Sequence, residues 1–578
     1  ERYKADLEAY LSDTSGYDIE INGDIQWQIL PTLGLTAEKI SAANAEEKIS
    51  VGQLTLNAQF GNIFSALDSW QIHQFNVQNV VIDSAGSQMI VRSLTLKDFQ
   101  PETPSPFELD FAYQAGADVA ADDFNLKGSL TYISLEASNT GQSTLVKFTN
   151  TALTSTYANG ICSGEVSDNA APPSVASTND DLLPVESILA FDANIACNLS
   201  ELNAGEYKFN NAKLNVKQVA GKSKATLALA DFFGGNLNTI ADINVNPVPV
   251  EWDISFEGAD IDSRKLLELS ESKLNWQAPL EVKGQLKMLG NTEQALADSI
   301  VGSANLDGGQ GSIDISQVKK ALVVINQLAS TKEPVGELPD QLQYNNLQAA
   351  WTIQGQANSL VVDLDNLQTS ASGQIQFLAD NLNLSGSAVV NTPQPGQQIK
   401  LTPALMNTAI PFDCEGQLAE PSCKPNTKAI GKMLVQILKN SQQDKVKKKM
   451  GDKEFDKIAD DYINGKITEE DLAVIAPLFK ASSVVVPGAI PYTFAATALL
   501  IDFFCANTSV LSSTSFTKSA KIPFPDGSLP IVLFFASCSS SFCFCIDRFL
   551  REFVELSFNS FILLFILSPA KSSRLEGA

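Results

Sequence analysis

The sequence predicts a mainly β protein, a long antiparallel meander curled into an elongated groove or gutter. Apolar and polar residues alternate with period two over one stretch after another, as strands with one buried face require. No long helix interrupts these stretches, so only a short N-terminal helix, a few small helices and C-terminal amphipathic helices are expected. With 578 residues, the chain can form several domains or one extended repetitive body.

A short helix opens the chain and a hairpin is predicted to follow it. Apolar residues recur at helical spacing up to Thr14–Gly16, which ends the helix; they are Tyr3, Leu7, Tyr10 and Leu11. Two alternating runs come next, with Asn22-Gly23-Asp24 between them as the turn. The first run presents Tyr17, Ile19 and Ile21, and the second presents Ile25, Trp27 and Ile29. Alternation therefore places Ile25, Trp27 and Ile29 along one face.

The meander continues from Ile49 to Phe99 and beyond, and it is interrupted once by a different composition. Between Ser163 and Glu186 the sequence is rich in Pro, Ser, Asn and Asp, which indicates an irregular surface loop. The chain divides accordingly into a β region (1–160), a Pro/Ser-rich loop (161–187), a second β region (188–427), amphipathic and short helices (428–480), and a tail (481–578).

Charge and composition exclude several function classes. The net charge of −26 opposes binding to nucleic acid, whose phosphates require clustered Lys and Arg. The single histidine, His73, has no Cys, Asp or Glu cluster with ligand spacing around it, so neither a metal site, a cofactor nor a catalytic residue is predicted. Gly308-Gly309-Gln310-Gly311 leads into a strand rather than a helix and lacks Lys-Ser/Thr, so a tight turn is favoured over a phosphate loop.

The opening segment resembles the AsmA family of bacterial envelope proteins. A helix, a Gly-Tyr entry, a Gly-Asp turn, Trp27 and the exit Pro31-Thr-Leu-Gly-Leu35 follow in the family's order. Later segments resemble the family as well: ALADFFGGNLNTIADINV, ADIDSRKLLEL, LEVKGQLKMLGNT, the strands of 347–390, and the closing pattern IPFDCEGQLAEP followed by a helix. The resemblance covers most of residues 1–430.

The resemblance implies a location and a function. AsmA-like proteins are held in the inner membrane of Gram-negative bacteria by an N-terminal anchor, here expected upstream of Glu1, with a β-rich body in the periplasm. They are similar to bridge-like lipid transfer proteins, whose β-gutters shield acyl chains. The expected function is assistance in outer-membrane assembly and phospholipid homeostasis, with phospholipid and outer-membrane assembly proteins as partners. Ile25, Trp27 and Ile29 are the candidate groove residues.

The same alternation fits a dry, closed core equally well. The alternative function is therefore a structural or regulatory periplasmic β-scaffold that binds envelope proteins and holds no lipid. An apolar groove wide enough for acyl chains favours the first function, and a fully packed core favours the second. An enzyme is not predicted, because no constellation of catalytic residues is evident.

Four cysteines lie in the body. Cys414 and Cys423 flank a short strand and turn, where a disulfide can cross a hairpin, and Cys162 and Cys197 flank the Pro/Ser-rich loop. An oxidising periplasm permits both disulfides, and closing such loops stabilises by ~3 kcal/mol. Four buried free thiols are the alternative.

The C-terminal part differs from the β body. The helix from Ile430 to Leu438 has one apolar face and runs into a lysine cluster, so it either caps the open end of the sheet or docks on a membrane surface. Residues 481–578 are rich in Phe, have balanced charges and lack strand alternation. A frame error or assembly junction after about Lys480 is the leading hypothesis, and a membrane-inserting tail is the alternative.

Overall fold

The computed structural model describes most residues from 17 to 426 and, before them, the helical residues Lys4, Ala5, Glu8, Ala9 and Ser12. The description omits 29–32, 45–46, 59–71, 85–86, 115–120, 135–143, 169–180, 205–206, 270–274, 316–338, 402–405 and 417–421, some single residues, and all but one residue from 427 onward. The amphipathic helices and the tail of the sequence analysis lie outside the described residues.

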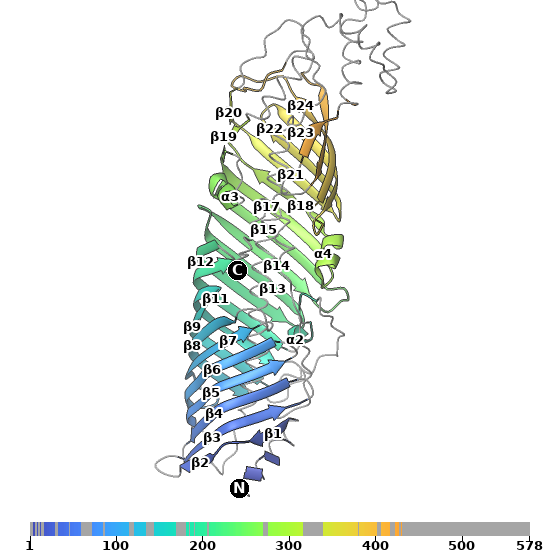
Figure 1. Ribbon diagram of the computed structural model, residues 1–578. Helices are drawn as coiled ribbons and strands as arrows, with labels where there is room; N and C mark the ends of the chain where they lie inside the picture. The colour runs from blue at the N-terminus through green and yellow to red at the C-terminus, as the bar shows by residue number, and fades with distance from the viewer. Residues whose placement is uncertain are drawn as a thin grey trace, which may run out of the picture.

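The described chain forms one antiparallel sheet of 23 strands and a second sheet of three short strands (Figure 1). Its first strands are β1 (Asp18–Ile21), β2 (Ile25–Gln28), β3 (Leu33–Ala43), β4 (Glu47–Ala58), β5 (Ile72–Ser84), β6 (Ser87–Phe99), β7 (Ser105–Gln114), β8 (Asp122–Ser134), β9 (Thr144–Ser155) and β10 (Ala158–Asp168). It continues with β11 (Phe191–Ala204), β12 (Tyr207–Val219), β13 (Lys222–Phe232), β14 (Gly235–Asn244), β15 (Glu251–Asp262), β17 (Pro279–Leu289), β18 (Val301–Asp307), β21 (Leu347–Gln354), β22 (Ala357–Leu364), β23 (Leu367–Gln376), β24 (Asn381–Val390), β25 (Ala409–Gly416) and β26 (Ser422–Pro425).

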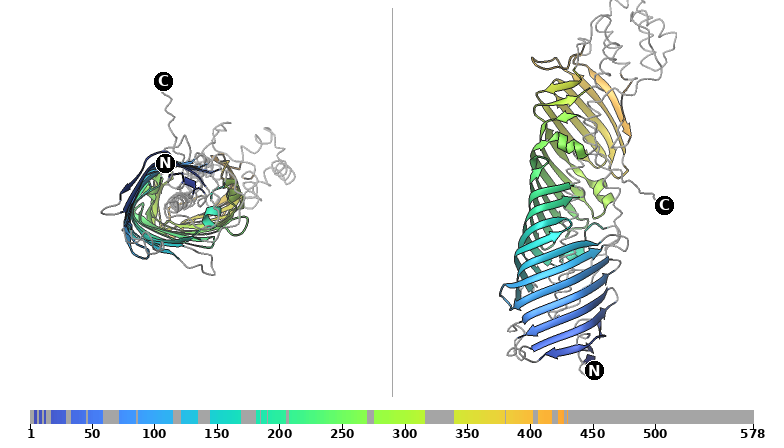
Figure 2. Two further views of the ribbon diagram at one scale, coloured as in Figure 1. Left: turned by 90° about the horizontal axis from the view of Figure 1, so that it is seen from below. Right: turned by 60° about the vertical axis from the view of Figure 1, so that its left-hand side comes forward.

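Almost every strand pairs with its neighbours in the sequence, which confirms the predicted antiparallel meander. The two expected β regions are parts of one sheet, because β10 pairs with β11 across the Pro/Ser-rich segment. The expected loop boundary at 161 falls inside β10, which extends to Asp168. Seen along its length, the sheet curls on itself (Figure 2), and it does not close into a barrel: among the described strands, β26 pairs only with β25.

The hairpin predicted for Tyr17–Ile29 is wrong. β1 and β2 do not pair with each other; both pair with β3, one after the other. Asn22–Asp24 is a bulge, and the N–H groups of Asn22 and Gly23 donate to the carbonyls of Lys39 and Glu38 at 2.8 and 3.0 Å. A Cβ on Gly23 would lie 2.2 Å from the Glu38 oxygen, so glycine permits this close approach. An Asn-Gly pair suits a turn or a bulge, and pairing with the eleven-residue β3 selects the bulge.

Irregular positions lie side by side on neighbouring strands. Lys39 on β3 and Asn79 on β5 have positive φ angles of 53° and 54°. In the pairing of β4 with β5, Gly52 and Asn79 are left out of the series of matched residues. In the pairing of β6 with β7, the register shifts at Arg92. Bulges increase local twist and bend a sheet, so a line of them across several strands promotes the curl. The bulged Arg92 also reaches two strands, with Asp110 at 2.8 Å and Asp123 as ion-pair partners.

The second sheet is a bent extension of the first. It consists of β16 (Trp276–Gln277), β19 (Gly311–Asp314) and β20 (Gln341–Tyr344). In the chain, β16 precedes β17, β19 follows β18 and β20 precedes β21, and the three short strands pair in the same order as these neighbours. The glycine-rich Gly308–Gln310 connects β18 to β19, so the strand expected after these glycines is confirmed. Trp276 is fully buried and donates from Nε1 to the Tyr344 hydroxyl at 2.6 Å.

Between the described strands, three short helices lie beside the sheet: α2 (Val185–Leu189), α3 (Ser263–Leu269) and α4 (Glu293–Ser299). The segment before α2 is tied to the turn before α4. The Leu182 and Leu183 N–H groups donate to the Asn291 carbonyl and side-chain oxygen at 2.7 and 2.9 Å, and the Asn291 amide donates back to Leu183. Leu182, Leu183 and Ile188 are buried, so this segment covers apolar side chains near one margin of the sheet.

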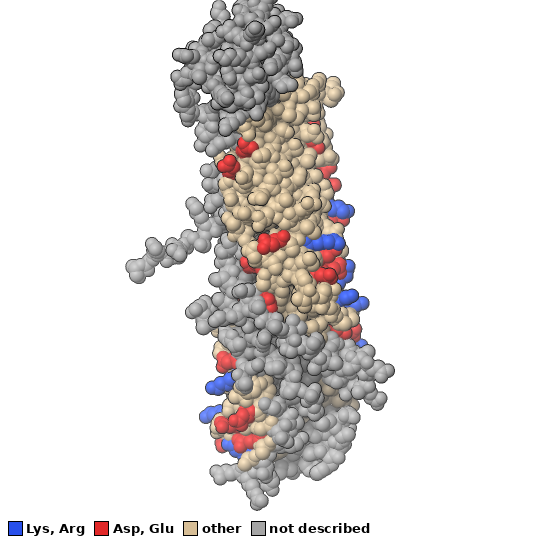
Figure 3. Space-filling view, turned by 90° about the vertical axis from the view of Figure 1, so that its right-hand side faces the viewer, with Lys and Arg blue, Asp and Glu red and all other residues tan. Residues whose placement is uncertain are grey.

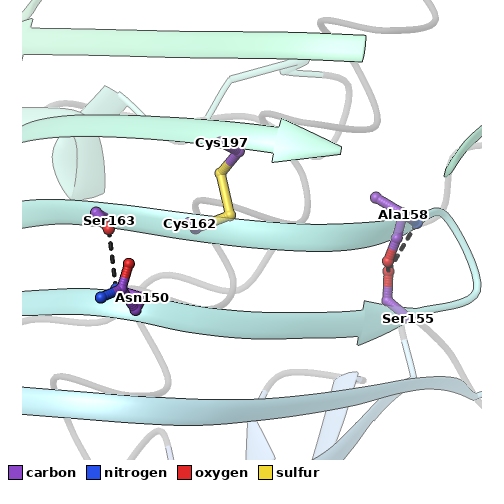
Figure 4. Close-up of a disulfide and its surroundings, with 6 residues drawn as sticks. All are labelled: Asn150, Ser155, Ala158, Cys162, Ser163 and Cys197. Atoms are coloured by element: carbon purple, nitrogen blue, oxygen red, sulfur yellow. Dashed lines mark hydrogen bonds between the residues drawn. A yellow bond between two sulfur atoms is a disulfide. The ribbon is translucent and has the colours of Figure 1, made fainter. Parts of the chain in front are cut away.

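Both predicted disulfides are present. Cys162–Cys197 joins β10 to β11 (Figure 4), and Cys414–Cys423 joins β25 to β26. In each pair the two cysteines lie directly opposite each other in the register. Beside the first disulfide, the bulged Asn150 donates its N–H to Ser163 Oγ at 3.0 Å. Such bonds fit an oxidising, extracytoplasmic environment.

We call the buried face of the large sheet the inner face and the opposite one the outer face. The outer face carries ion pairs between directly opposed residues of adjacent strands, such as Lys224–Asp242 and Asp253–Lys287, both at 3.2 Å. Each exposed pair contributes at most about 1 kcal/mol. In Figure 3, acidic and basic residues alternate along one margin, while the middle of the view is largely uncharged. Within the described part of the chain, no helix combines the length and apolarity that crossing a membrane requires.

Candidate functional site: the inner face of the sheet

An almost entirely apolar row of side-chain positions crosses the inner face. It takes one residue from each successive strand of the large sheet from β2 to β25, and each lies directly opposite the next. Opposed residues of antiparallel strands project from the same face with Cβ atoms ~5 Å apart, so the row is continuous. Its members are Ile25, Ala37, Leu54, Val77, Leu94, Leu109, Leu126, Leu153, Gly160, Leu199, Ala212, Leu229, Leu237, Gly258, Val282, Leu306, Ala349, Val362, Thr369, Ala388 and Ile410.

Burial along this row changes between β10 and β11. Every member from Leu199 on β11 to Ile410 on β25 is buried. The part of the row before β11 is mixed: Ile25, Leu94, Leu126 and Leu153 are half-buried, whereas four other members are buried, namely Ala37, Leu54, Val77 and Leu109. The inner face of β2–β10 therefore keeps apolar surface within reach of solvent, whereas the inner face of β11–β25 is packed.

Neighbouring rows on β4–β9 also mix buried and half-buried side chains. Their half-buried inner-face side chains are Val51, Leu56, Phe107, Leu130, Tyr132 and Val146. The buried apolar residues also separate into two clusters, one within 19–124 and one within 148–423. The division falls at β8–β9, where accessible apolar side chains such as Leu130 and Tyr132 gather.

The structure places two of the three residues that the sequence analysis singled out for a groove. Ile25 begins the apolar row, and Trp27 lies two residues further along the same face, opposite Leu35. Trp27 is 60% exposed, the largest exposed apolar side chain at the β2 end. Ile29 lies outside the described residues. The other half-buried residues of β4–β9 were not singled out, although their alternation with polar neighbours was visible; register was needed to align them with Ile25.

Among the described residues, the buried part of the inner face carries no charge. The buried set contains no Asp, Glu, Lys or Arg, and its polar members are Ser, Thr, Asn and Gln. Burying an unpaired charge is costly. Asp122, at the start of β8, shares the face of Phe124 but lies at the margin of the sheet and accepts a hydrogen bond from the Tyr157 hydroxyl at 2.6 Å. The half-buried part of the inner face, on β2–β10, can therefore contact hydrocarbon.

Aromatic rings on the inner face lie over glycines of the adjacent strand. Phe256 faces Gly284 and Phe412 faces Gly386 in the register. A Cβ on either glycine would lie 2.3 or 2.6 Å from the ring's Cζ atom, so the ring occupies the space that a side chain would need. Phe148 and Gly164 repeat the arrangement. These rings lie along the sheet rather than standing up from it.

No reactive constellation accompanies this surface. Among the described residues, no group of three His, Cys, Asp or Glu side chains could hold a metal ion. His73 is exposed on β5, and its Nδ1 atom lies 3.4 Å from Asp98 Oδ1. Chemically, the sheet presents an apolar inner surface, with charged residues on the outer face and at the margins.

No protein-family model, curated protein or solved structure matches this chain. The resemblance to the AsmA family therefore rests on the residue patterns given above.

Proposed function

We propose that the inner face of β2–β10 holds the acyl chains of phospholipid. In this proposal the chain is the periplasmic body of an AsmA-like envelope protein, anchored in the inner membrane of a Gram-negative bacterium, which assists outer-membrane assembly and phospholipid homeostasis. The observation that supports it most is that four apolar members of the row between β2 and β10, Ile25, Leu94, Leu126 and Leu153, stay half-buried.

The energetics suit an apolar groove without polar recognition. Each CH₂ group removed from water contributes about 0.8 kcal/mol, so contacts with Leu94, Leu126, Leu130 and Tyr132 suffice to retain a long acyl chain. A headgroup can remain in water because the sheet does not close into a barrel. The two disulfides fit the periplasmic location.

The test is native mass spectrometry with lipid extraction on the full chain produced in a bacterial periplasm. We expect phospholipid to co-purify with the wild-type chain and to be lost from Trp27→Asp and Leu126→Asp. Gln28→Asp is the matched control, because Gln28 is the exposed neighbour of Trp27 on the opposite face. Circular dichroism must show that all variants remain folded.

A photo-crosslink locates the lipid directly. p-Benzoylphenylalanine at Tyr132, on the inner face of β8, should crosslink to phospholipid. The same group at Lys127, exposed on the outer face of β8, should not. A well-folded, lipid-free chain with no crosslink at position 132 would overturn the proposal.

The packed inner face of β11–β25 favours a second candidate function. Leu199, Leu237 and Ile410 are at most 3% exposed, as expected for a rigid β-scaffold that binds envelope proteins and holds no lipid. A lipid-free chain that captures envelope proteins through its outer face would support this candidate.

A further inference from the structure

The first edge of the large sheet is covered by side chains of the N-terminal helical residues. β1 pairs with β3 along one edge, which leaves the N–H groups of Ile19 and Ile21 on the other. Ile19 donates to Ser12 Oγ at 2.9 Å, and Ile21 donates to Glu8 Oε1 at 2.7 Å. Further along, Lys4 Nζ lies 3.5 Å from the Gly23 carbonyl. These side chains occupy the positions that another strand would take.

The match between helix and strand is geometric. Lys4, Glu8 and Ser12 are helical and spaced by four, so they share one helix face and recur every ~6 Å. Alternate residues of a strand, here Ile19, Ile21 and Gly23, recur every ~6.6 Å. One face of the helix, running antiparallel to β1, can therefore satisfy successive backbone groups along the edge.

The opposite end of the sheet is protected in another way. β26 has only four residues, it is fixed to β25 by the Cys414–Cys423 disulfide, and it includes Pro425, which has no N–H to offer a partner. Short strands and proline are known means of preventing edge-to-edge association. A head-to-tail contact between β26 and β1 is therefore disfavoured, and the β1 edge is left to pair with another β1 edge.

We propose that Glu8 and Ser12 form an edge cap that keeps this chain monomeric, and that the uncapped β1 edge binds a second copy of the chain. Two β1 edges can pair antiparallel about a two-fold axis, because each then presents the same N–H and C=O groups to the other. This contact uses the backbone edge and no inner-face side chain, so the proposal is independent of lipid binding.

The test compares two double variants of the full chain by size-exclusion chromatography with light scattering. Glu8→Ala/Ser12→Ala removes both acceptors and should double the mass in a concentration-dependent manner. Glu8→Gln/Ser12→Thr keeps both acceptors and should remain monomeric. The proposal would be overturned if Glu8→Ala/Ser12→Ala stayed monomeric at its highest soluble concentration. It would also be overturned if both double variants associated equally.

Two further measurements tie the association to the edge. In dilute, monomeric samples, the Ile19 and Ile21 amides of the Ala/Ala variant should exchange hydrogen about tenfold faster than in the Gln/Thr variant. p-Benzoylphenylalanine at Glu20, an exposed position on β1, should crosslink two copies only in the Ala/Ala background. A dimer without this crosslink would place the contact elsewhere and contradict the proposal.

Discussion

At the scale of single residues, the inner face depends on pairs of unequal size. Gly284 lies beneath the Phe256 ring, and both are central to the packed part of the sheet. Glycine in a strand normally weakens it, because it has no side chain to pack. Here the ring of the neighbouring strand supplies the missing contact, so glycine and phenylalanine together fill a volume that neither fills alone.

Gly284→Val should destabilise the chain by about 2 kcal/mol, because the added side chain forces the Phe256 ring out of its position. Chemical denaturation followed by circular dichroism measures the change. Asn305→Val, at an exposed outer-face position of β18, is the control and should have little effect. In a Phe256→Ala background the cost of Gly284→Val should shrink; an unchanged cost would show that the ring is not its cause.

Tyr344 gives the folded chain a pH dependence in the alkaline range. Burial, which outweighs the hydrogen bond from Trp276, raises the pKa of Tyr344 from 10.0 to about 12. The unfolded chain therefore loses this proton first, so the stability associated with Tyr344 is complete below pH ~10 and declines as the pH rises toward ~12. Two pKa units correspond to about 3 kcal/mol.

Tyr344→Phe should reduce this alkaline decline while lowering stability at neutral pH by about 1–3 kcal/mol, because Trp276 Nε1 loses its buried partner. The measurement is the free energy of unfolding at pH 9 and pH 11 for both chains. If the free energy of unfolding fell no more steeply between pH 9 and pH 11 in the wild-type chain than in Tyr344→Phe, Tyr344 would not be the source of the pH dependence.

At the scale of elements, the two disulfides constrain loops of different length. Cys162 and Cys197 are 35 residues apart, whereas Cys414 and Cys423 are 9 apart. In the chain-entropy account, losing the first costs about 4 kcal/mol and losing the second about 2.5 kcal/mol. Cys162→Ser/Cys197→Ser should therefore lower the free energy of unfolding more than Cys414→Ser/Cys423→Ser.

The second pair of substitutions should also have a local effect. Among the described strands, β26 is the last and is held by four residue pairs with β25, so without its disulfide the amides of residues 422–424 should exchange as in a frayed strand. Amides of β11 should keep their protection in the same variant. Loss of protection throughout the sheet would show that the Cys414–Cys423 disulfide supports more than the edge.

Much of the secondary structure was predictable, because successive residues of a strand project from opposite faces and only one of the two faces is apolar. The strands, their inner faces and both cysteine pairs follow from local sequence. The assignment failed at Asn22–Asp24, because the same residues suit a turn or a bulge and the choice depends on β3, a partner further along the chain. In the bent extension, β19 was expected, but its pairing with β16 and β20 was missed for the same reason. Its strands are short, and only pairing between distant segments defines them.

At the scale of the whole molecule, one apolar row crosses regions of different burial. Local sequence could not reveal this difference, since Leu126 and Leu237 alternate with polar neighbours in the same way. Leu126 is half-buried on β8, and Leu237 is 2% exposed on β14. The same substitution at these two positions therefore separates the proposed lipid surface from the packed core.

Leu237→Asp should cost about 3–5 kcal/mol, because it places an unpaired carboxylate in a core that excludes water. Leu126→Asp should cost less than about 1.5 kcal/mol, since its carboxylate can reach solvent, and it should abolish phospholipid co-purification. Denaturation and lipid extraction measure the two effects. Thr154→Asp, exposed on the outer face of β9, should leave stability and bound lipid unchanged. Equal destabilisation at 126 and 237 would show that β2–β10 and β11–β25 share one closed core, and it would favour the scaffold over the lipid-binding protein.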